Sequence, residues 1–175
     1  SGEPEIIPLL TEENVKDLEI TGVTCDSRKV QKGFAFVCIK GSLSDGHDYA
    51  SKALEQGAAV IICEKDLNID NQVVVEDTHK AFATMSANWF SNPADSLKLI
   101  GVTGTNGKTS TATLIHKILE RKYGDCGFIG TGKILIGKQI ITDRRYSLTT
   151  PDPELLYPAL KAMADAGIRY VVMEV

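Results

Sequence analysis

The sequence predicts an α/β fold of two units, a small N-terminal α/β unit and a second unit built on a mainly parallel sheet. Short apolar β runs alternate with amphipathic helical segments along the chain, a pattern typical of α/β proteins. The turn Ser91-Asn92-Pro93 interrupts this pattern, the boundary falls near residues 92–96, and a new β run follows. We therefore expect two domains, at residues 1–94 and 95–175.

The first unit is predicted to contain short strands and two helices. The strands are apolar runs at residues 19–25, 34–39, 58–63 and 72–75. One helix is expected at 49–56, because Gly57 follows it directly. The other begins at Asp77 or Thr78, either of which can cap it, and runs to about Phe90.

The second unit is predicted to begin with a strand at 97–103 and a helix at 108–121. A strand at 126–129 follows, and then a hairpin of 133–136 and 139–142 around Gly137 and Lys138. Asp152 and Pro153 suit the start of a helix that reaches Ala166. Pro158 removes one backbone hydrogen bond inside that helix, so we expect a kink or a start nearer Tyr157.

The final run, 169–175, is apolar enough for a strand buried on both faces of a parallel sheet. Such a sheet needs helices on both faces, and no further helix follows in the sequence. We therefore expect the 175 residues to be part of a longer protein.

Composition narrows the range of partners. The chain is 43% hydrophobic, and its formal charge of -4 provides no basic field for general binding to nucleic acid or anionic membranes. Its apolar stretches are far shorter than the ~20 residues of a membrane span, so we expect a cytoplasmic protein without membrane insertion. The four cysteines form no C-x-x-C pair, which indicates reduced thiols rather than a zinc site or a disulfide framework.

The segment from Gly101 to Ser110 lies between a β run and a helix, where a phosphate-binding loop belongs. Its glycines allow backbone N–H groups to turn toward phosphate oxygens, Lys108 can neutralise the β and γ charges, and the Thr109 hydroxyl can ligate magnesium. The usual first glycine is replaced by Val102, so the loop is a shorter-spaced variant. The alternative is a chance glycine turn before a helix.

Glu174 ends the last apolar run of this unit. Ligands gather at the carboxyl ends of strands in open parallel sheets, so Glu174 could hold the magnesium ion. A solvated carboxylate at a strand end is an equally good interpretation, and the residue pattern leaves both open.

The motifs resemble those of a known family. Residues 103–109 resemble the ATP loop that Mur ligases share with folylpolyglutamate and cyanophycin synthetases. Residues 24–30, 33–37, 40–41 and 45–49 resemble the UDP-binding domain of MurE-type and MurF-type ligases, although Phe34 stands where an acidic residue is common. Residues 148–153 and 172–175 resemble the MurE type.

This resemblance implies a set of site residues. ATP would be bound by Gly104, Thr105, Asn106, Gly107, Lys108, Thr109 and Ser110, and magnesium by Thr109 and Glu174, with Lys108 and Glu174 as catalytic residues. The UDP moiety would lie near Cys25, Ser27, Ser42, Leu43 and Ser44, and the muramoyl-dipeptide near Thr149 and Thr150. From the residues alone, a helix-capping turn at 41–47 and a capping segment at Thr149 and Thr150 remain alternatives. We interpret His47, His79 and His116 as surface or helix-face residues without a chemical role.

The implied activity is an ATP-dependent ligation in peptidoglycan synthesis. It joins a diamino acid, meso-diaminopimelate or L-lysine, to UDP-MurNAc-L-Ala-D-Glu through an acyl phosphate. Full-length members have a further amino-acid-binding domain, so we expect these residues alone to be inactive. The alternatives are a MurF-type ligase that adds D-Ala-D-Ala, a non-catalytic nucleotide-binding fragment, and a generic phosphate-loop kinase or GTPase.

Overall fold

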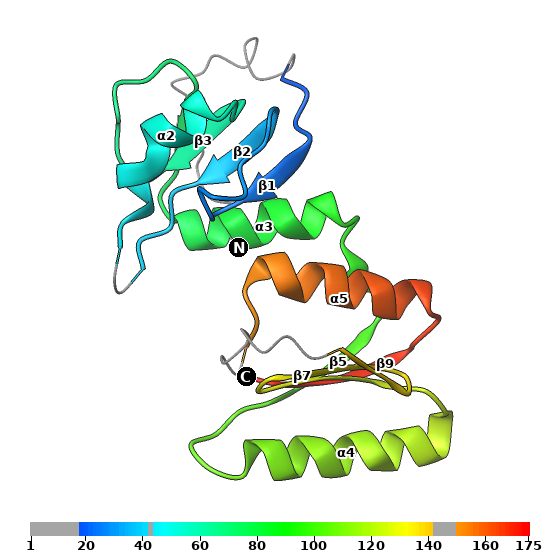
Figure 1. Ribbon diagram of the computed structural model, residues 1–175. Coiled ribbons are helices and arrows are strands. Elements are labelled where there is room, and N and C mark those ends of the chain that lie inside the picture. Colours follow the sequence, from blue (N-terminus) through cyan, green and yellow to red (C-terminus); the bar gives the residue numbers. More distant parts are fainter. Residues whose placement is uncertain (1–17, 42–43, 142–149) are drawn as a thin grey trace. The chain divides into compact units, whose positions relative to one another are not determined.

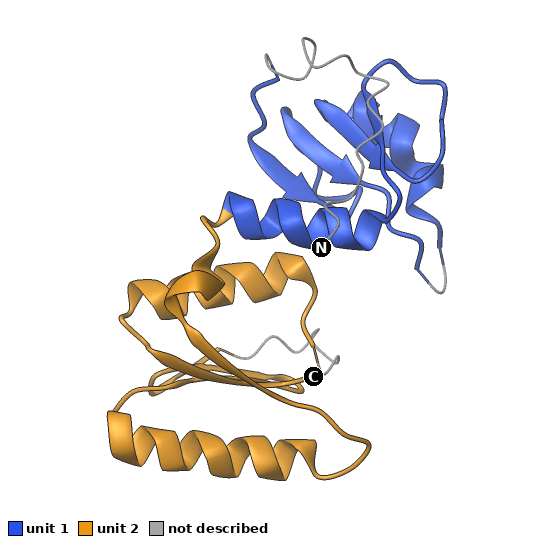
Figure 2. Ribbon diagram, turned by 180° about the vertical axis from the view of Figure 1, so that it is seen from behind, with its two compact units in different colours: residues 1–89 blue, residues 90–175 orange. Residues whose placement is uncertain are grey.

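The computed structural model describes residues 18–41, 44–141 and 150–175. The chain separates into two compact units between Trp89 and Phe90, and each is described by itself (Figure 2). Both combine helices with a sheet that contains parallel strands, which confirms the predicted α/β fold class. Within the described residues, no helix is long and apolar enough to cross a membrane.

Unit 1 contains a four-stranded sheet in which every neighbouring pair is parallel. Its strands, in spatial and sequence order, are β1 (Gly22–Thr24), β2 (Phe34–Val37), β3 (Val60–Cys63) and β4 (Gln72–Val74). Its helices are the short 3₁₀ helix η1 (Gly46–Tyr49), α2 (Ala50–Glu55) and α3 (Thr78–Trp89). Strand β1 is shorter than predicted, and the expected helix at 49–56 is divided between η1 and α2.

Alternation along β2 places side chains on both faces of this sheet. Ala35 and Val37 belong to a buried cluster that includes Phe82 of α3, whereas Phe36 packs with Ala53 of α2 on the opposite face. Successive residues of a strand point to opposite faces, so one apolar run supplies both clusters. Full burial of a side chain such as Phe36 stabilises the fold by about 1.5–3 kcal/mol.

Unit 2 is a three-layer arrangement with a sheet between two helices (Figure 1). After the 3₁₀ helix η2 (Pro93–Ser96), its strands are β5 (Lys98–Val102), β6 (Gly127–Gly130), β7 (Lys133–Ile136), β8 (Gln139–Ile141) and β9 (Tyr170–Glu174). The order in space is β5-β9-β6-β7-β8, in which β5, β9 and β6 run parallel while β7 and β8 form the predicted hairpin. Helix α4 (Lys108–Tyr123) covers one face and α5 (Pro153–Asp165) the other.

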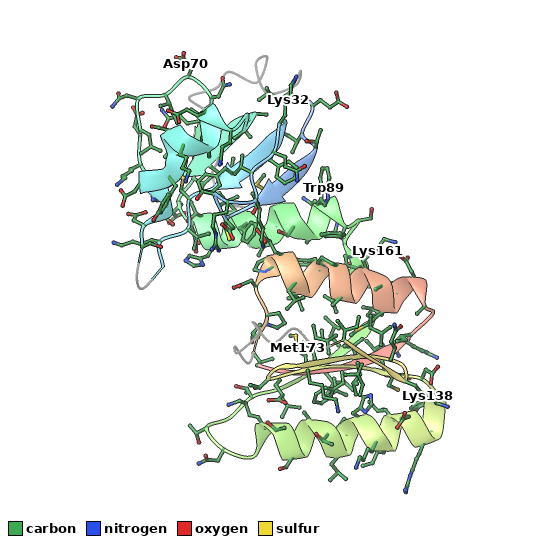
Figure 3. The ribbon with its side chains drawn as sticks, viewed as in Figure 1. Lys32, Asp70, Trp89, Lys138, Lys161 and Met173 are labelled. Carbon is green, nitrogen blue, oxygen red and sulfur yellow. The ribbon has the colours of Figure 1, made fainter. Side chains whose placement is uncertain are left out.

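Strand β9 lies between β5 and β6 and is buried on both faces, as its apolar sequence predicts. Val171 packs toward α5 with Leu160 and Met163, whereas Val172 packs toward α4 with Ala112. Side chains fill the space on both sides of the sheet (Figure 3). Because β9 is held by a neighbour on each side, the residue at its carboxyl end has a fixed position.

Helix α5 corrects one expectation. It begins at Pro153 and continues through Pro158, so the later start near Tyr157 is wrong. Pro158 removes a single backbone hydrogen bond, while the buried face that includes Leu160 and Met163 spans the rest of the helix. Burial of that face outweighs the lost bond.

Candidate functional site

The phosphate-type loop lies at the carboxyl end of β5 and leads directly into α4. Gly104 has φ +143° and Gly107 has φ +78°, backbone conformations that other residues adopt only with strain. The loop and the first turn of α4 line a cavity of about 270 Å³, whose lining consists of Thr105, Asn106, Gly107, Lys108, Thr109, Ser110, Thr131 and Glu174. Helix N-termini present unpaired backbone N–H groups, so this cavity suits an anion.

Lys108 is the first residue of α4, and its ammonium group returns to the loop. Its Nζ donates a hydrogen bond of 2.7 Å to the carbonyl oxygen of Gly104. This contact holds a positive charge at the cavity beside the N-terminal end of the helix dipole. The Lys108 ammonium and the N-terminus of α4 both attract negatively charged ligand groups.

Glu174 reaches this loop through the register of two parallel strands. Val102, the last residue of β5, pairs with Glu174 of β9, and the backbone N–H of Val175 donates to the Val102 carbonyl at 2.9 Å. Oε2 of Glu174 accepts a hydrogen bond of 3.0 Å from the Thr109 hydroxyl. The carboxylate is only 1% exposed, so the interpretation as a solvated strand-end residue is wrong.

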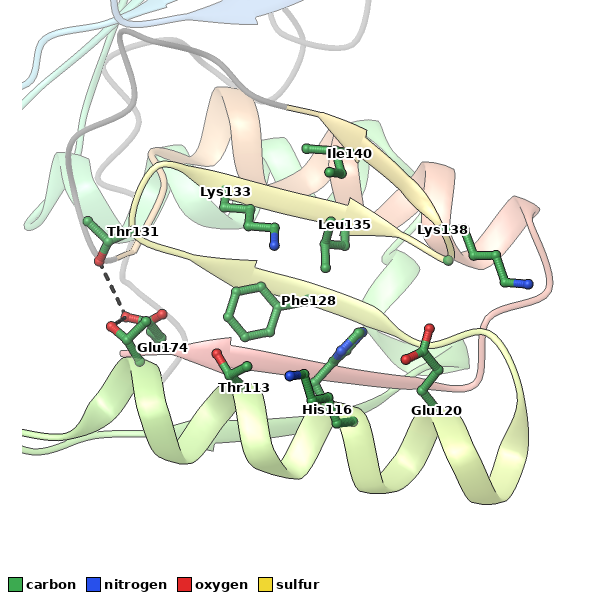
Figure 4. Close-up of a pocket in the computed structure, with 13 residues that line it drawn as sticks. Thr113, His116, Glu120, Phe128, Thr131, Lys133, Leu135, Lys138, Ile140 and Glu174 are labelled. Carbon is green, nitrogen blue, oxygen red and sulfur yellow. Dashed lines mark hydrogen bonds between the residues drawn. The ribbon is translucent and has the colours of Figure 1, made fainter.

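Two residues at the end of β6 also position this carboxylate. The Thr131 hydroxyl donates to the same Oε2 at 3.3 Å (Figure 4). A Cβ atom on Gly130 would lie 2.4 Å from Oε1, so only glycine leaves room for Glu174 in this position. Sequence reasoning missed both residues, although the end of a strand next to β9 was a place to look for them.

The two oxygens of the Glu174 carboxylate differ in their hydrogen bonding. Oε1 is buried and has no hydrogen-bond partner among the described residues, which is costly for an ionised group. Among the described residues, no group of three or more histidine, cysteine or acidic side chains could hold a metal ion. A cation at this position would therefore need oxygen ligands from elsewhere, such as phosphates and water.

A larger pocket of about 480 Å³ continues from Thr109 and Glu174 along α4 (Figure 4). Phe128, Leu135 and Ile140 contribute its apolar lining. His116 also lines it; the ring is buried on the inner face of α4 and meets the Phe128 ring edge-on at 5.5 Å. The expectation of a helix-face histidine is correct for this residue.

The predicted nucleotide residues of unit 1 lie beyond the carboxyl ends of adjacent parallel strands. Cys25 and Ser27 follow β1, and Ser44 lies in the connection after β2. Cys25 is partly buried and packs against the apolar cluster that includes Phe82 of α3. Ser27 is half-buried, whereas Ser44 is exposed. The predicted residues Ser42 and Leu43 lie outside the described residues.

The two threonines predicted to contact the dipeptide precede α5. Thr149 lies outside the described residues, while Thr150 is described and exposed. Asp152 occupies the N-cap position, but its side chain makes no capping hydrogen bond; its backbone carbonyl accepts from Leu155 and Leu156 instead.

Family models match both units of the chain. Residues 102–175 match the Mur ligase middle domain, and residues 19–93 match the model described as Mur ligase family, catalytic domain. Together the two models extend over both candidate sites.

Individual relatives agree with these models. The UDP-N-acetylmuramoyl-L-alanyl-D-glutamate--2,6-diaminopimelate ligase of Clostridium perfringens is 42% identical over 163 residues, which cover 91% of this chain and 33% of the relative. A solved structure of a ligase with the same description has a TM-score of 0.74 at 28% identity and matches 89% of this chain, which corresponds to 32% of that structure. MurF ligase from Thermotoga maritima, solved in complex with ADP, has a TM-score of 0.52 at 28% identity, over 90% of this chain and 32% of that one. The chain thus spans about a third of the length of the relatives it matches, and it belongs to the Mur ligase family.

Proposed function

We propose that this chain is the nucleotide-handling part of an ATP-dependent ligase that joins 2,6-diaminopimelate to UDP-MurNAc-L-Ala-D-Glu. The observation that carries the proposal is the pairing of the phosphate-type loop with the buried Glu174 at the ends of β5 and β9. The names of the relatives at about 40% identity support this substrate pair. Activity is proposed for the complete protein, since the chain covers a third of those relatives.

The proposed reaction has two steps. A carboxylate oxygen of the D-glutamate attacks the γ-phosphorus of ATP, which breaks the bond to ADP and gives an acyl phosphate. The amine of the diamino acid then attacks the acyl carbon, phosphate leaves, and an amide forms with loss of a proton. No protein nucleophile is required, because phosphoryl transfer depends on positioning and charge neutralisation.

The residues of unit 2 have distinct roles in this proposal. The N–H groups of the loop hold the β and γ phosphates in line for attack, and Lys108 neutralises charge that develops on their oxygens. Lys108 already lies over the loop through its 2.7 Å bond to Gly104. Gly104 and Gly107 keep the loop in the conformation that this requires.

Thr109 and Glu174 suit a magnesium ion, which when bound would neutralise phosphate charge. Two neighbouring ligands at ~2.1 Å from an octahedral ion lie about 3 Å apart. The Thr109 hydroxyl and Oε2 of Glu174 are 3.0 Å apart, and the unpartnered Oε1 gives this carboxylate a further reason to attract a cation. Magnesium usually takes few protein ligands and completes its shell with phosphate and water, in agreement with a site of two residues.

Substrate binding is proposed for the loops beyond the carboxyl ends of β1 and β2 in unit 1, and for the segment before α5. The UDP moiety would contact Cys25, Ser27 and the connection that contains Ser42, Leu43 and Ser44, while Thr149 and Thr150 would contact the muramoyl-dipeptide. The positions of Cys25, Ser27 and Ser44 beyond adjacent parallel strands support this, since ligands of open parallel sheets collect there. Exposure of Ser44 and Thr150 is also compatible with ligand contact.

Amide formation by the complete protein tests this function. We expect ADP release with UDP-MurNAc-L-Ala-D-Glu and 2,6-diaminopimelate, and little with L-lysine. A MurF-type ligase would instead require the UDP-tripeptide and D-Ala-D-Ala. Preference for that second pair, or for GTP over ATP, would contradict the proposal, whereas preference for L-lysine would change only the amino acid.

A further inference from the structure

His47 connects the loops that follow β2 and β3, at the carboxyl ends of the strands of unit 1. Its side chain is only 4% exposed, although the sequence pattern favours a surface or helix-face residue. Its Nδ1 lies 2.5 Å from Oδ1 of Asp45, in the connection after β2. The backbone N–H of Glu64, directly after β3, donates to Nε2 at 3.0 Å. The imidazole therefore bridges the ends of two neighbouring strands.

The partners of His47 define its tautomer. A backbone N–H can only donate, so Nε2 must be the unprotonated acceptor and the ring proton is on Nδ1. Nδ1–H then donates to Asp45, and the imidazole is neutral. In this form the ring accepts at one end and donates at the other, so both nitrogens are satisfied.

Glu64 extends this connection to α3. Its Oε1 accepts hydrogen bonds from the backbone N–H and the hydroxyl of Thr78, at 2.9 and 2.8 Å. These bonds lower the pKa of Glu64, so its side chain remains an ionised acceptor at the start of the helix. A series of hydrogen bonds thus runs from α3 through the end of β3 to Asp45.

The connection after β2 is closed on itself where it meets His47. Lys40 and Asp45 form a β-bridge, and the Gly41 N–H donates to the Ser44 carbonyl at 2.9 Å. Gly46 packs so closely against Ile39, just after β2, that an added Cβ would lie 2.6 Å from the Ile39 nitrogen. These contacts within residues 39–46 therefore couple the position of Ser44 to that of His47.

We propose that His47 is a positioning residue for nucleotide recognition. Through its neutral ring it holds Ser44 and Asp45, beyond the carboxyl end of β2, in the arrangement that binds the UDP end of the precursor. This inference rests on the proposed function, because that function places UDP there. His47 itself is buried and acts through Asp45 rather than by touching the ligand.

Two substitutions distinguish the contact made by Nε2 of His47 from the contact made by Nδ1. In His47→Gln the side-chain oxygen reaches approximately as far as Nε2 and can still accept from the Glu64 N–H. Asp45 also keeps a hydrogen bond in this variant, because the backbone N–H of residue 47 donates to its Oδ1 at 3.0 Å. In His47→Asn the amide reaches only as far as Nδ1, so the contact with Glu64 is lost. We expect His47→Asn to weaken binding of UDP-MurNAc-L-Ala-D-Glu to the 175-residue chain about tenfold, equivalent to ~1.4 kcal/mol, and His47→Gln to weaken it less than threefold.

Calorimetry with the precursor measures these affinities, and ATP binding to unit 2 serves as an internal control that should not change. Equal affinity of His47→Asn and the wild type would overturn the inference alone. Equal losses in both variants, in proportion to their losses of thermal stability, would show a purely structural role and also overturn it. Failure of the wild type to bind the precursor while it binds ATP would refute the proposed UDP site and the inference with it.

A second measurement requires no variant. Coupling between two sites is reciprocal, so if the Glu64 contact favours precursor binding, the bound precursor must strengthen that contact. We expect hydrogen exchange of the Glu64 amide in the wild-type chain to slow at least threefold when the precursor is added. Unchanged exchange under saturating precursor would overturn the inference even if the His47→Asn variant did not fold.

Discussion

Replacing Gly130 by alanine tests the position of the Glu174 carboxylate without changing any group that carries charge. The added Cβ would lie 2.4 Å from Oε1 of Glu174 and 2.6 Å from Cε1 of Phe128. An ordinary contact begins at 3.4 Å, so the carboxylate must move by about 1 Å. That movement would take Oε2 away from the Thr109 hydroxyl.

The expected effect on the complete ligase is large. A misplacement of about 1 Å can cost on the order of 10²-fold in rate, or about 2.7 kcal/mol in the barrier. We expect kcat to fall by this factor and the magnesium requirement to rise, while the KM for the UDP precursor stays nearly constant. Overpacking should also lower the free energy of unfolding by about 1–3 kcal/mol.

Release of ADP at increasing magnesium concentration measures this effect, with circular dichroism to establish that the variant is folded. Gly101→Ala is the matched control, because Gly101 lies on β5 beside the same loop and its Cβ would meet only Val175 Cγ2, at 3.4 Å. A Gly130→Ala enzyme with kcat within twofold of the wild type and the same magnesium dependence would refute the role given to Glu174.

Three further outcomes follow from single side chains. Lys108→Ala should abolish ATP turnover in the complete protein, while Lys117→Ala on the same helix leaves it intact; phosphate release measures both, and turnover by the Lys108 variant would contradict the loop assignment. Hydrogen bonds from the Arg28 guanidinium lower the pKa of Asp26 from 3.8 to about 2, against a smaller opposing effect of burial. The Asp26 carboxylate therefore stabilises the fold above pH 3.8 and loses this effect as the pH falls through about 2, so urea midpoints of Asp26→Asn and wild type should differ at pH 7 and converge near pH 2. Burial raises the pKa of Cys38 to about 12, so iodoacetamide at pH 8 should modify this thiol only in denaturant, as mass spectrometry would reveal.

Local features of the site were predictable from the sequence. The strand, glycine loop and helix around Lys108 are contiguous in the chain, and their conformations depend on residue types such as Gly104 and Gly107. Glu174 could be proposed because it ends an apolar run, although its burial beside Thr109 depends on the pairing of β5 with β9. Residues 65 positions apart meet there, a separation that pattern reasoning does not resolve.

The features that sequence reasoning missed depend on tertiary contacts. Thr131 and Gly130 matter only because β6 lies next to β9, although β7, β8 and α5 separate the two strands in the sequence. The sequence favours a surface or helix-face position for His47, and only the tertiary fold places the Glu64 amide, at the end of β3, against its ring. Pro158 predicts a later start of α5 only when the cost of one hydrogen bond is considered without the burial of the helix face.

The two candidate sites differ in how far the chain itself satisfies their polar groups. In unit 1, both nitrogens of His47 are paired and Glu64 is bound to α3, so the loops after β2 and β3 are held in place before any ligand arrives. In unit 2, no residue in the described part of the chain pairs with Oε1 of Glu174, which lies in a cavity that the start of α4 also lines. Unpaired buried charge is costly unless an opposite charge compensates it. We therefore expect the first candidate site to be preorganised for a ligand that it holds by shape and hydrogen bonds, and the second to be completed by the charges of its ligand.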